Sequence, residues 1–214
     1  MAVEAVIWDF GGVLTSSPFE AFARYEKERG LPKDLIRTIN ATNPDTNAWA
    51  LFERSEIDID GFDRLFAGEA ALLGHDVPGR AIIELLSGDI RPEMVEALKR
   101  CKARAKVACI TNNVPAGKGA GMARSEEKAK AVAEVMALFD HVIESSKIGI
   151  RKPDPRIYQL ACEALGVTAA GCVYLDDLGI NLKPAAALGM KTIKVLGVEQ
   201  ALADLEAAVG FPVR

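Results

Sequence analysis

The chain has 214 residues, of which 50% are hydrophobic and 26% charged, and its 26 Lys and Arg against 30 Asp and Glu give a net charge of −4. This length and balance are typical of a globular protein with a sizeable core, so they exclude a disordered chain and a scaffold that depends on disulfides. The acidic balance argues against non-specific binding to nucleic acid or to anionic lipid.

The beginning of the chain and its cysteines predict the compartment. Met1-Ala2-Val3-Glu4 carries no basic residue before an apolar stretch, and no run of about 18 apolar residues follows. The four cysteines show no Cys-x-x-Cys spacing, and three of them lie in apolar segments. We therefore expect a cytoplasmic protein with reduced cysteines, without a disulfide, a zinc site or a membrane segment.

The first expected strand, Val3–Trp8, is followed by a long insertion. Roughly 95 residues separate its end at Asp9 from the next expected strand at Lys106, far more than the crossover helix that joins two parallel strands. Apolar periodicity and turn residues predict helices at Phe19–Arg29, Lys33–Ile39, Ala48–Arg54, Ile59–Leu73 and Ile82–Leu86. We infer a helical domain at residues 16–88, placed over one end of the sheet and inserted into a core domain of residues 1–15 and 89–214.

Helices and strands alternate in the rest of the chain. Helices are expected from Pro92 to about Cys101, from Ser125, from Asp154-Pro155 to Gly166, and from about Leu178 to Gly189. The expected strands between them are Lys106–Ile110, His141–Glu144, Cys172–Leu175 and Lys191–Val195. This alternation predicts an α/β fold with a Rossmann-like parallel sheet and helices on both of its faces.

Chemically useful residues follow two of these strands. Asp9 ends the first strand and precedes Phe10-Gly11-Gly12, so a tight turn allowed by glycine exposes a carboxylate that is a candidate nucleophile. The second strand runs into Thr111-Asn112-Asn113, which offers a hydroxyl and backbone N–H groups to an anion. Open α/β sheets place their sites at the carboxyl ends of the strands, so we expect these groups to meet there.

Two further segments complete the chemistry. The adjacent carboxylates of Asp176 and Asp177 repel each other unless a cation or donors lie between them, and a hard divalent ion is the simplest remedy. Lys152 lies on a rigid segment before a helix, where it can balance carboxylate and phosphate charge. A carboxylate nucleophile, an anion site, a lysine and an acidic pair are together what phosphoryl transfer through an aspartyl-phosphate requires.

The motifs that carry these residues resemble those of the haloacid dehalogenase superfamily across essentially the whole chain. The resemblance is greatest to the N-terminal phosphatase domain of soluble epoxide hydrolases and its stand-alone bacterial relatives. It rests on Phe10–Leu14, Arg151–Tyr158 and Leu175–Ala185.

The resemblance implies a role for each matched residue. Asp9 would take the phosphoryl group, Thr111 and the backbone N–H of Asn112 would hold its oxygens, and Lys152 would steady both. The helical insertion would be the cap that closes over the site and contacts the substrate. A small phosphorylated metabolite is the expected substrate, and the protein is expected to be a monomer or a homodimer that binds neither nucleic acid nor membrane.

The resemblance also implies a Mg²⁺ site. Asp9, the backbone carbonyl of Gly11 and Asp177 would bind the ion, and Asp176 would act mainly through a water molecule. Asn181 is interpreted as a structural residue.

One position departs from the pattern of the family. Its phosphatases usually carry a second aspartate two residues after the nucleophile as general acid, and this chain has Gly11 there. Losing a general acid costs on the order of 10²–10⁴ in rate unless something replaces it. Substrates with good leaving groups need no acid, and a hydroxyl of Thr15, Ser16 or Ser17, a cap group or a water molecule is a possible substitute.

Two other functions stay open. A 2-haloacid dehalogenase also uses an aspartate nucleophile without the second aspartate, but its ester intermediate needs no metal, and holding Asp176 and Asp177 near Asp9 without one would be costly. A catalytically degenerate protein that binds a phosphorylated ligand is the other alternative, and Gly11 would be its signature.

Overall fold

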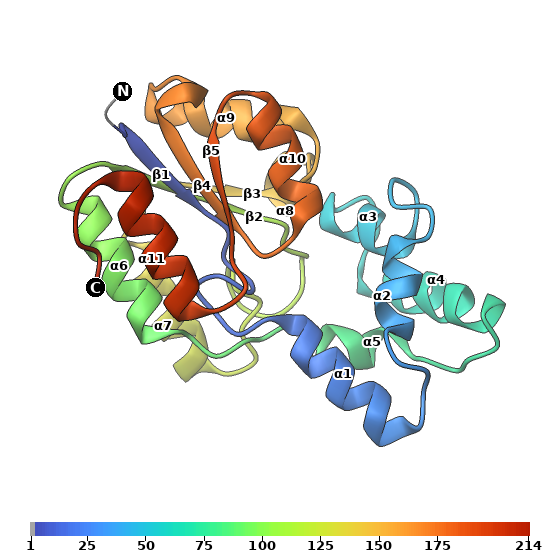
Figure 1. Cartoon of the computed structure of the whole chain (residues 1–214). Helices are drawn as coiled ribbons and strands as arrows, with labels where there is room; N and C mark the ends of the chain where they lie inside the picture. The colour runs from blue at the N-terminus through green and yellow to red at the C-terminus, as the bar shows by residue number, and fades with distance from the viewer. Residues whose placement is uncertain (1–2) are drawn as a thin grey trace.

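The computed structural model describes residues 3–214 and contains a five-stranded parallel sheet (Figure 1). Its strands are β1 (Ala5–Trp8), β2 (Lys106–Thr111), β3 (His141–Glu144), β4 (Cys172–Asp176) and β5 (Lys191–Lys194). They lie in the order β3-β2-β1-β4-β5, so the first strand of the chain is the central one. The predicted Rossmann-like α/β fold is confirmed.

Helices cover both faces of the sheet. Val6 and Trp8 of β1 pack in the hydrophobic cluster that contains buried residues of α6 (Pro92–Lys102), α7 (Glu126–Met136) and α11 (Val198–Val209). Ala5 and Ile7 point to the other face and pack with α9 (Pro155–Leu165) and α10 (Gly179–Ala187). All four residues of β1 are fully buried, as expected for a strand covered on both sides.

Five helices form the insertion between β1 and α6. They are α1 (Pro18–Arg29), α2 (Leu35–Ala41), α3 (Ala48–Glu53), α4 (Ile59–Leu72) and α5 (Gly79–Ile83). We call residues 18–83 the helical insertion. Its core is aromatic, with the Phe62 ring stacked on Phe52 and Phe66, and Val114 of the loop after β2 belongs to the same cluster. Figure 1 shows the insertion beyond the end of the sheet toward which the strands point.

Two helices of the insertion begin where the sequence pattern did not place them. Helix α2 begins at Leu35 and not at Lys33, because the buried Glu26 carboxylate accepts the N–H groups of Asp34 and Ile36 and so caps the helix from outside. Helix α5 begins at Gly79 and not at Ile82, because the chain turns at Pro78 and Gly79 lies directly against α4.

Three further elements were not predicted. They are the short helix α8 (Ser145–Ile148), the 3₁₀ turn η1 (Ala169–Gly171) and the C-terminal helix α11. Among residues 3–214, no helix is long and apolar enough to cross a membrane.

Two links join the insertion to the rest of the protein, and they run side by side. Thr15 pairs with Ile90 in an antiparallel bridge, and the Ser16 N–H donates to the Asp89 carbonyl at 2.8 Å. There is no room for a side chain at Gly88, because a Cβ atom at this position would lie 2.6 Å from the Ser16 carbonyl oxygen. The segments that enter and leave the helical insertion are therefore close neighbours.

Candidate active site

The residues with predicted chemistry meet at one edge of the sheet. Asp9 follows β1, Thr111 is the last residue of β2, and Asp176 is the last residue of β4. In the strand register, Trp8 pairs with Cys109 on one side and with Leu175 on the other. Asp9 therefore lies between the carboxyl ends of its two neighbouring strands, where open α/β sheets place their sites.

The Asp9 carboxylate is buried and has one free oxygen. Its Oδ1 accepts the Phe10 N–H at 2.7 Å and contacts the Lys152 ammonium at 2.8 Å. Its Oδ2 accepts no hydrogen bond from residues 3–214. Burial raises the pKa of Asp9, Lys152 opposes that shift, and the charges of Asp176 and Asp177 reinforce it, so that the pKa lies well above its ordinary value. A further cation beside Asp9 would favour its ionised form.

Lys152 is the positive charge of the site. Its side chain is 2% exposed, and its Nζ lies 2.8 Å from both Asp9 Oδ1 and Asp176 Oδ2. Burial acts to lower the pKa of Lys152, but the attraction of Asp176 and Asp9 outweighs it and raises the pKa above its ordinary value. Lys152 is therefore held as a cation between two carboxylates from different strands.

Asp176 is fully buried and surrounded by donors. Besides Lys152, the Tyr174 hydroxyl, the Leu178 N–H and the Asn181 side-chain amide all donate to its carboxylate. Asn181, interpreted from the sequence as structural, is itself buried and donates to both oxygens of Asp176. Tyr174 was missed, although residues two apart in a strand share a face and Asp176 follows Tyr174 at that spacing.

Asp177 is partly exposed and lies against the Gly12 backbone. Burial and, less strongly, the charge of Asp176 raise the pKa of Asp177 to about 6, and the Ser17 hydroxyl donates to its Oδ2 at 3.3 Å. Gly12 has φ +77°, and a Cβ atom there would lie 2.2 Å from Asp177 Oδ2. Arg91 fixes the same turn by donating to the Gly12 carbonyl at 2.8 Å. The turn therefore requires glycine at position 12.

The three aspartates form an oxygen-rich cluster that fits a divalent cation. One carboxylate oxygen from each of Asp9, Asp176 and Asp177 lies within 4.8 Å of the others. Lys152 supplies one positive charge to these three carboxylates, so the cluster has an excess of negative charge. A small set of carboxylate oxygens is the donor set that Mg²⁺ prefers.

Gly11 lies beside open space. A Cβ atom at this position would meet nothing within 4 Å, and its backbone does not adopt the left-handed conformation. The three neighbouring hydroxyls are engaged: that of Thr15 donates to backbone carbonyls, that of Ser16 accepts the Asp89 N–H, and that of Ser17 donates to Asp177. The structure therefore has room for a side chain where the sequence has none.

Glu53 and Arg151 lie at the edge of the site and were not predicted to act there. Glu53, the last residue of α3, accepts the Arg151 Nε–H at 2.5 Å and the Asn112 side-chain N–H at 3.2 Å. Asn112 and Arg151 belong to the sheet side of the molecule, so these contacts join the helical insertion to the site. The sequence gives no signal for them, since Glu53 lies 98 positions from Arg151.

Comparison with known proteins connects this arrangement to one family. The chain matches the haloacid dehalogenase-like hydrolases over residues 3–189. It is 35% identical to mouse acyl-CoA dehydrogenase family member 10, over 97% of this chain and 19% of that protein. It is 28% identical to mouse bifunctional epoxide hydrolase 2, over 99% of this chain and 40% of that protein. The chain thus spans less than half of these mammalian relatives.

Relatives of similar length also exist. Phosphatase MT3486 of Mycobacterium tuberculosis is 29% identical, over 91% of this chain and 88% of that protein. Among solved structures, a Bacteroides thetaiotaomicron enzyme of the family, solved with magnesium and inorganic phosphate, matches with a TM-score of 0.57 at 17% identity, over 90% of this chain and 94% of that one. A dehalogenase matches with a TM-score of 0.64 at 20% identity, over 96% of each chain. At these identities the structures show the fold alone.

The turn at positions 11 and 12 generates a first prediction. Gly12→Ala adds a methyl group that strains the left-handed backbone and overlaps Asp177, so we expect a loss of about 1–3 kcal/mol in the free energy of unfolding. Gly11→Ala is the matched control, because its methyl group enters open space and should change stability by less than about 0.5 kcal/mol. Urea unfolding followed by circular dichroism measures both. Equal stability of the two variants would contradict the geometry described for Gly12.

Proposed function

The chain belongs to the haloacid dehalogenase-like hydrolases, and on this premise we propose that it is a Mg²⁺-dependent phosphatase that hydrolyses a small phosphorylated metabolite through an aspartyl-phosphate. One observation carries the proposal: a buried aspartate with a free oxygen, paired with a buried lysine, adjoins two more carboxylates at the carboxyl ends of the central strands. The relative named as a phosphatase supports the same reaction.

Each residue has a task in the proposed first step. Asp9 Oδ2 attacks phosphorus, the new bond to Asp9 forms, and the bond between phosphorus and the leaving oxygen breaks. Lys152 contacts Oδ1 of the same carboxylate and so fixes its direction of attack while balancing negative charge. The Thr111 hydroxyl and the Asn112 backbone N–H would hold the phosphoryl oxygens. The leaving oxygen takes its proton from water or from the substrate, because Gly11 supplies none.

The second step restores the enzyme. Water attacks the phosphorus of the aspartyl-phosphate, the bond to Asp9 breaks, and inorganic phosphate leaves. Asp9, the Gly11 carbonyl and Asp177 would hold Mg²⁺, with Asp176 acting through a water molecule because its oxygens already accept four protein donors. When bound, the ion would supply positive charge next to the phosphoryl oxygens.

The helical insertion is proposed to be the cap of this enzyme, with domain limits at residues 16–88. Its position beyond the carboxyl edge of the sheet, and the contact of Glu53 with Asn112 and Arg151, support this assignment. A cap in this place excludes water from the site and contacts the leaving group of the substrate.

A 2-haloacid dehalogenase is the second candidate. Gly11 favours it, since a dehalogenase lacks the second aspartate, and both activities would use an aspartate nucleophile. Against it stands the cluster of Asp9, Asp176 and Asp177, whose excess negative charge suits a metal-dependent reaction and hinders a metal-free one. A third candidate is a protein that binds a phosphorylated ligand without turnover. It would have the same site residues as the phosphatase and would differ only in lacking a measurable rate of hydrolysis.

The nucleophile is tested by Asp9→Asn. Because the amide cannot attack phosphorus, we expect phosphate release from p-nitrophenyl phosphate with Mg²⁺ to fall by about three orders of magnitude or more. A chelator should abolish release by the wild type, and added Mg²⁺ should restore it.

The control is Asp76→Asn, which changes an exposed aspartate of the helical insertion and should keep full activity. If the wild type releases no more phosphate than Asp9→Asn, the phosphatase proposal is wrong. Chloride release from 2-chloropropionate without metal would then identify a dehalogenase, and binding of phosphorylated ligands without either activity would identify the third candidate.

The open space at Gly11 generates a separate prediction about substrates. Gly11→Asp would place a carboxylic acid next to the leaving group, so we expect hydrolysis of an alkyl phosphate such as glucose 6-phosphate to rise on the order of 10²-fold. Hydrolysis of p-nitrophenyl phosphate, whose leaving group needs no acid, should change little. Gly11→Ala controls for the added Cβ atom and should raise neither rate. A rise for both substrates in Gly11→Ala would show that the acid is not the cause.

A further inference from the structure

Glu53 occupies an unfavourable place for a carboxylate. It ends α3, where the partial charge of helix carbonyls repels an anion, and its side chain is 14% exposed. Burial raises the pKa of Glu53, and the neighbouring Arg151 guanidinium opposes that shift. Within residues 3–214, hydrogen bonds from Arg151 and Asn112, both outside the helical insertion, and the charge of Lys152 compensate for this placement. The simplest explanation for a carboxylate at such an unfavourable position is that it has a specific function.

Both donors are connected to the Lys152 backbone, Asn112 by hydrogen bonds and Arg151 as the preceding residue. Asn112 Oδ1 accepts the Lys152 N–H at 2.8 Å, and Asn112 Nδ2 donates to the Lys152 carbonyl at 3.0 Å. The second N–H of the same amide goes to Glu53 at 3.2 Å, so the amide has one orientation that satisfies all three contacts. Arg151 precedes Lys152 in the chain and also donates to the Pro44 carbonyl of the helical insertion at 2.8 Å. The Lys152 backbone is thus held from both sides.

We propose that Glu53 is a positioning residue: by holding Asn112 and Arg151, it keeps the Lys152 ammonium between Asp9 and Asp176 while α3 lies against the sheet side of the site. Contact of the helical insertion with the site would thereby be coupled to the geometry of the lysine. This inference rests on the proposed function for its effect on rate, but not for its effect on the Lys152 backbone.

The test compares Glu53→Gln and Glu53→Ala with Glu84→Gln. Glu84, the residue directly after α5, forms an ion pair with Arg124 at 3.5 Å, which ties the end of the helical insertion to the loop after β2 and involves no residue of the site. We expect kcat for p-nitrophenyl phosphate to fall about 10-fold in Glu53→Gln and further in Glu53→Ala, with a smaller change in KM. Glu84→Gln should keep the wild-type kcat. Gln partly rescues because it still offers an acceptor to one donor.

Amide hydrogen exchange of Lys152, measured by NMR, separates this inference from the proposed function. Loss of Glu53 should loosen Asn112 and speed the exchange of the Lys152 N–H about 10-fold, whether or not the protein is a phosphatase. Unchanged Lys152 exchange in Glu53→Ala, or equal losses of kcat in the Glu53 and Glu84 variants, would overturn the positioning role. Faster exchange in a protein without phosphatase activity would uphold it and refute the proposed function alone.

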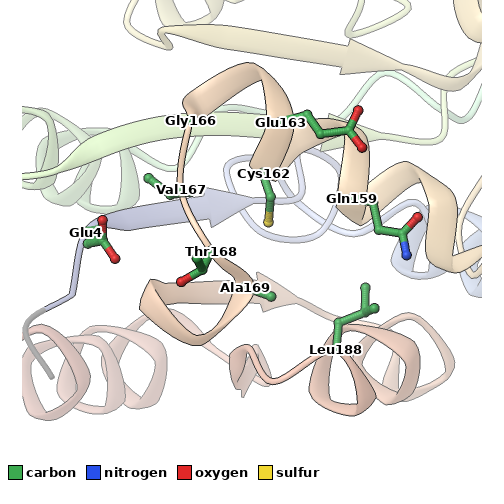
Figure 2. Close-up of a pocket in the computed structure, with 9 residues that line it drawn as sticks. All are labelled: Glu4, Gln159, Cys162, Glu163, Gly166, Val167, Thr168, Ala169 and Leu188. Carbon is green, nitrogen blue, oxygen red and sulfur yellow. The ribbon is translucent and has the colours of Figure 1, made fainter.

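A second inference concerns the opposite end of the sheet. Cys162 of α9 and Cys172 at the start of β4 lie with their sulfur atoms 4.0 Å apart. Their separation of ten positions gave no sequence signal of a pair. Cys162 lines a surface hollow of about 510 Å³, with Glu4, Gln159 and Thr168 among its other lining residues. Figure 2 shows the Cys162 side chain pointing from α9 into the space among these residues.

This pair has the geometry of a thiol modification site. Contact with the Cys172 sulfur, 4.0 Å away, lowers the pKa of Cys162 and so increases the thiolate that reacts with disulfides, while the Cys172 thiol donates to the Thr168 carbonyl at 3.3 Å. A disulfide bond brings two sulfur atoms to about 2 Å, so the two thiols must approach by about 2 Å to form one. Cys101 and Cys109, by contrast, are fully buried in the cluster on the other face of the sheet.

We infer that Cys162 and Cys172 form a site at which a small disulfide produces an intramolecular disulfide. The Cys162 thiolate attacks one sulfur of the small disulfide, a mixed disulfide forms, and one small thiol leaves. Cys172 loses its proton to water and attacks the Cys162 sulfur, and the second small thiol leaves. Two protein thiols are oxidised, and one small disulfide is reduced to two thiols.

Glutathione disulfide is the probe, and trypsin makes the readout simple. Residues 157–191 form one tryptic peptide, because Lys183 precedes proline, and this peptide holds Cys162 and Cys172 without the other cysteines. After oxidation we expect the peptide to lose two hydrogens and to resist alkylation by iodoacetamide, until dithiothreitol reverses both. Cys101→Ser should behave like the wild type, and Cys172→Ser should stop at the mixed disulfide on Cys162. A doubly alkylated peptide, or a lasting mixed disulfide in the wild type, would overturn the inference.

Discussion

The ammonium of Lys152, 2.8 Å from Asp9 and 2.8 Å from Asp176, is the interaction on which the rest of the site depends. Three carboxylates converge there in a buried setting, and without a cation they would repel one another and take up protons. The lysine neutralises part of this charge and joins the ends of two strands. The remaining negative charge is what makes the site suited to a divalent cation.

Most of this site could be predicted from the sequence because its residues directly follow strands. Once the alternation of strands and helices indicates a parallel sheet, the carboxyl ends of β1, β2 and β4 must share an edge, and Asp9, Thr111 and Asp176 come together by topology alone. The tight turn after Asp9 could also be predicted, because two glycines follow closely. The structure shows that Gly12 is needed there, since its backbone approaches Asp177 closely. The boundaries of α2 and α5 were less accessible, because a distant glutamate and a packed turn decide them.

The contacts that could not be predicted join segments distant in the sequence. Glu53 meets Asn112 and Arg151 because the helical insertion, built on its aromatic core, packs against Val114 of the loop after β2. The approach of Cys162 to Cys172 likewise results from the packing of α9 against the sheet. Periodicity and spacing describe single elements, whereas these pairs depend on how two elements are placed relative to each other.

The paired links at Thr15 and Ile90 have a consequence for the history of such a protein. Because the two ends of the insertion are neighbours, a genetic exchange can replace everything between them with another segment, long or short, without moving β1 or the carboxylate that follows it. A new segment would also have to replace the contacts that Glu53 and Pro44 make with Asn112 and Arg151.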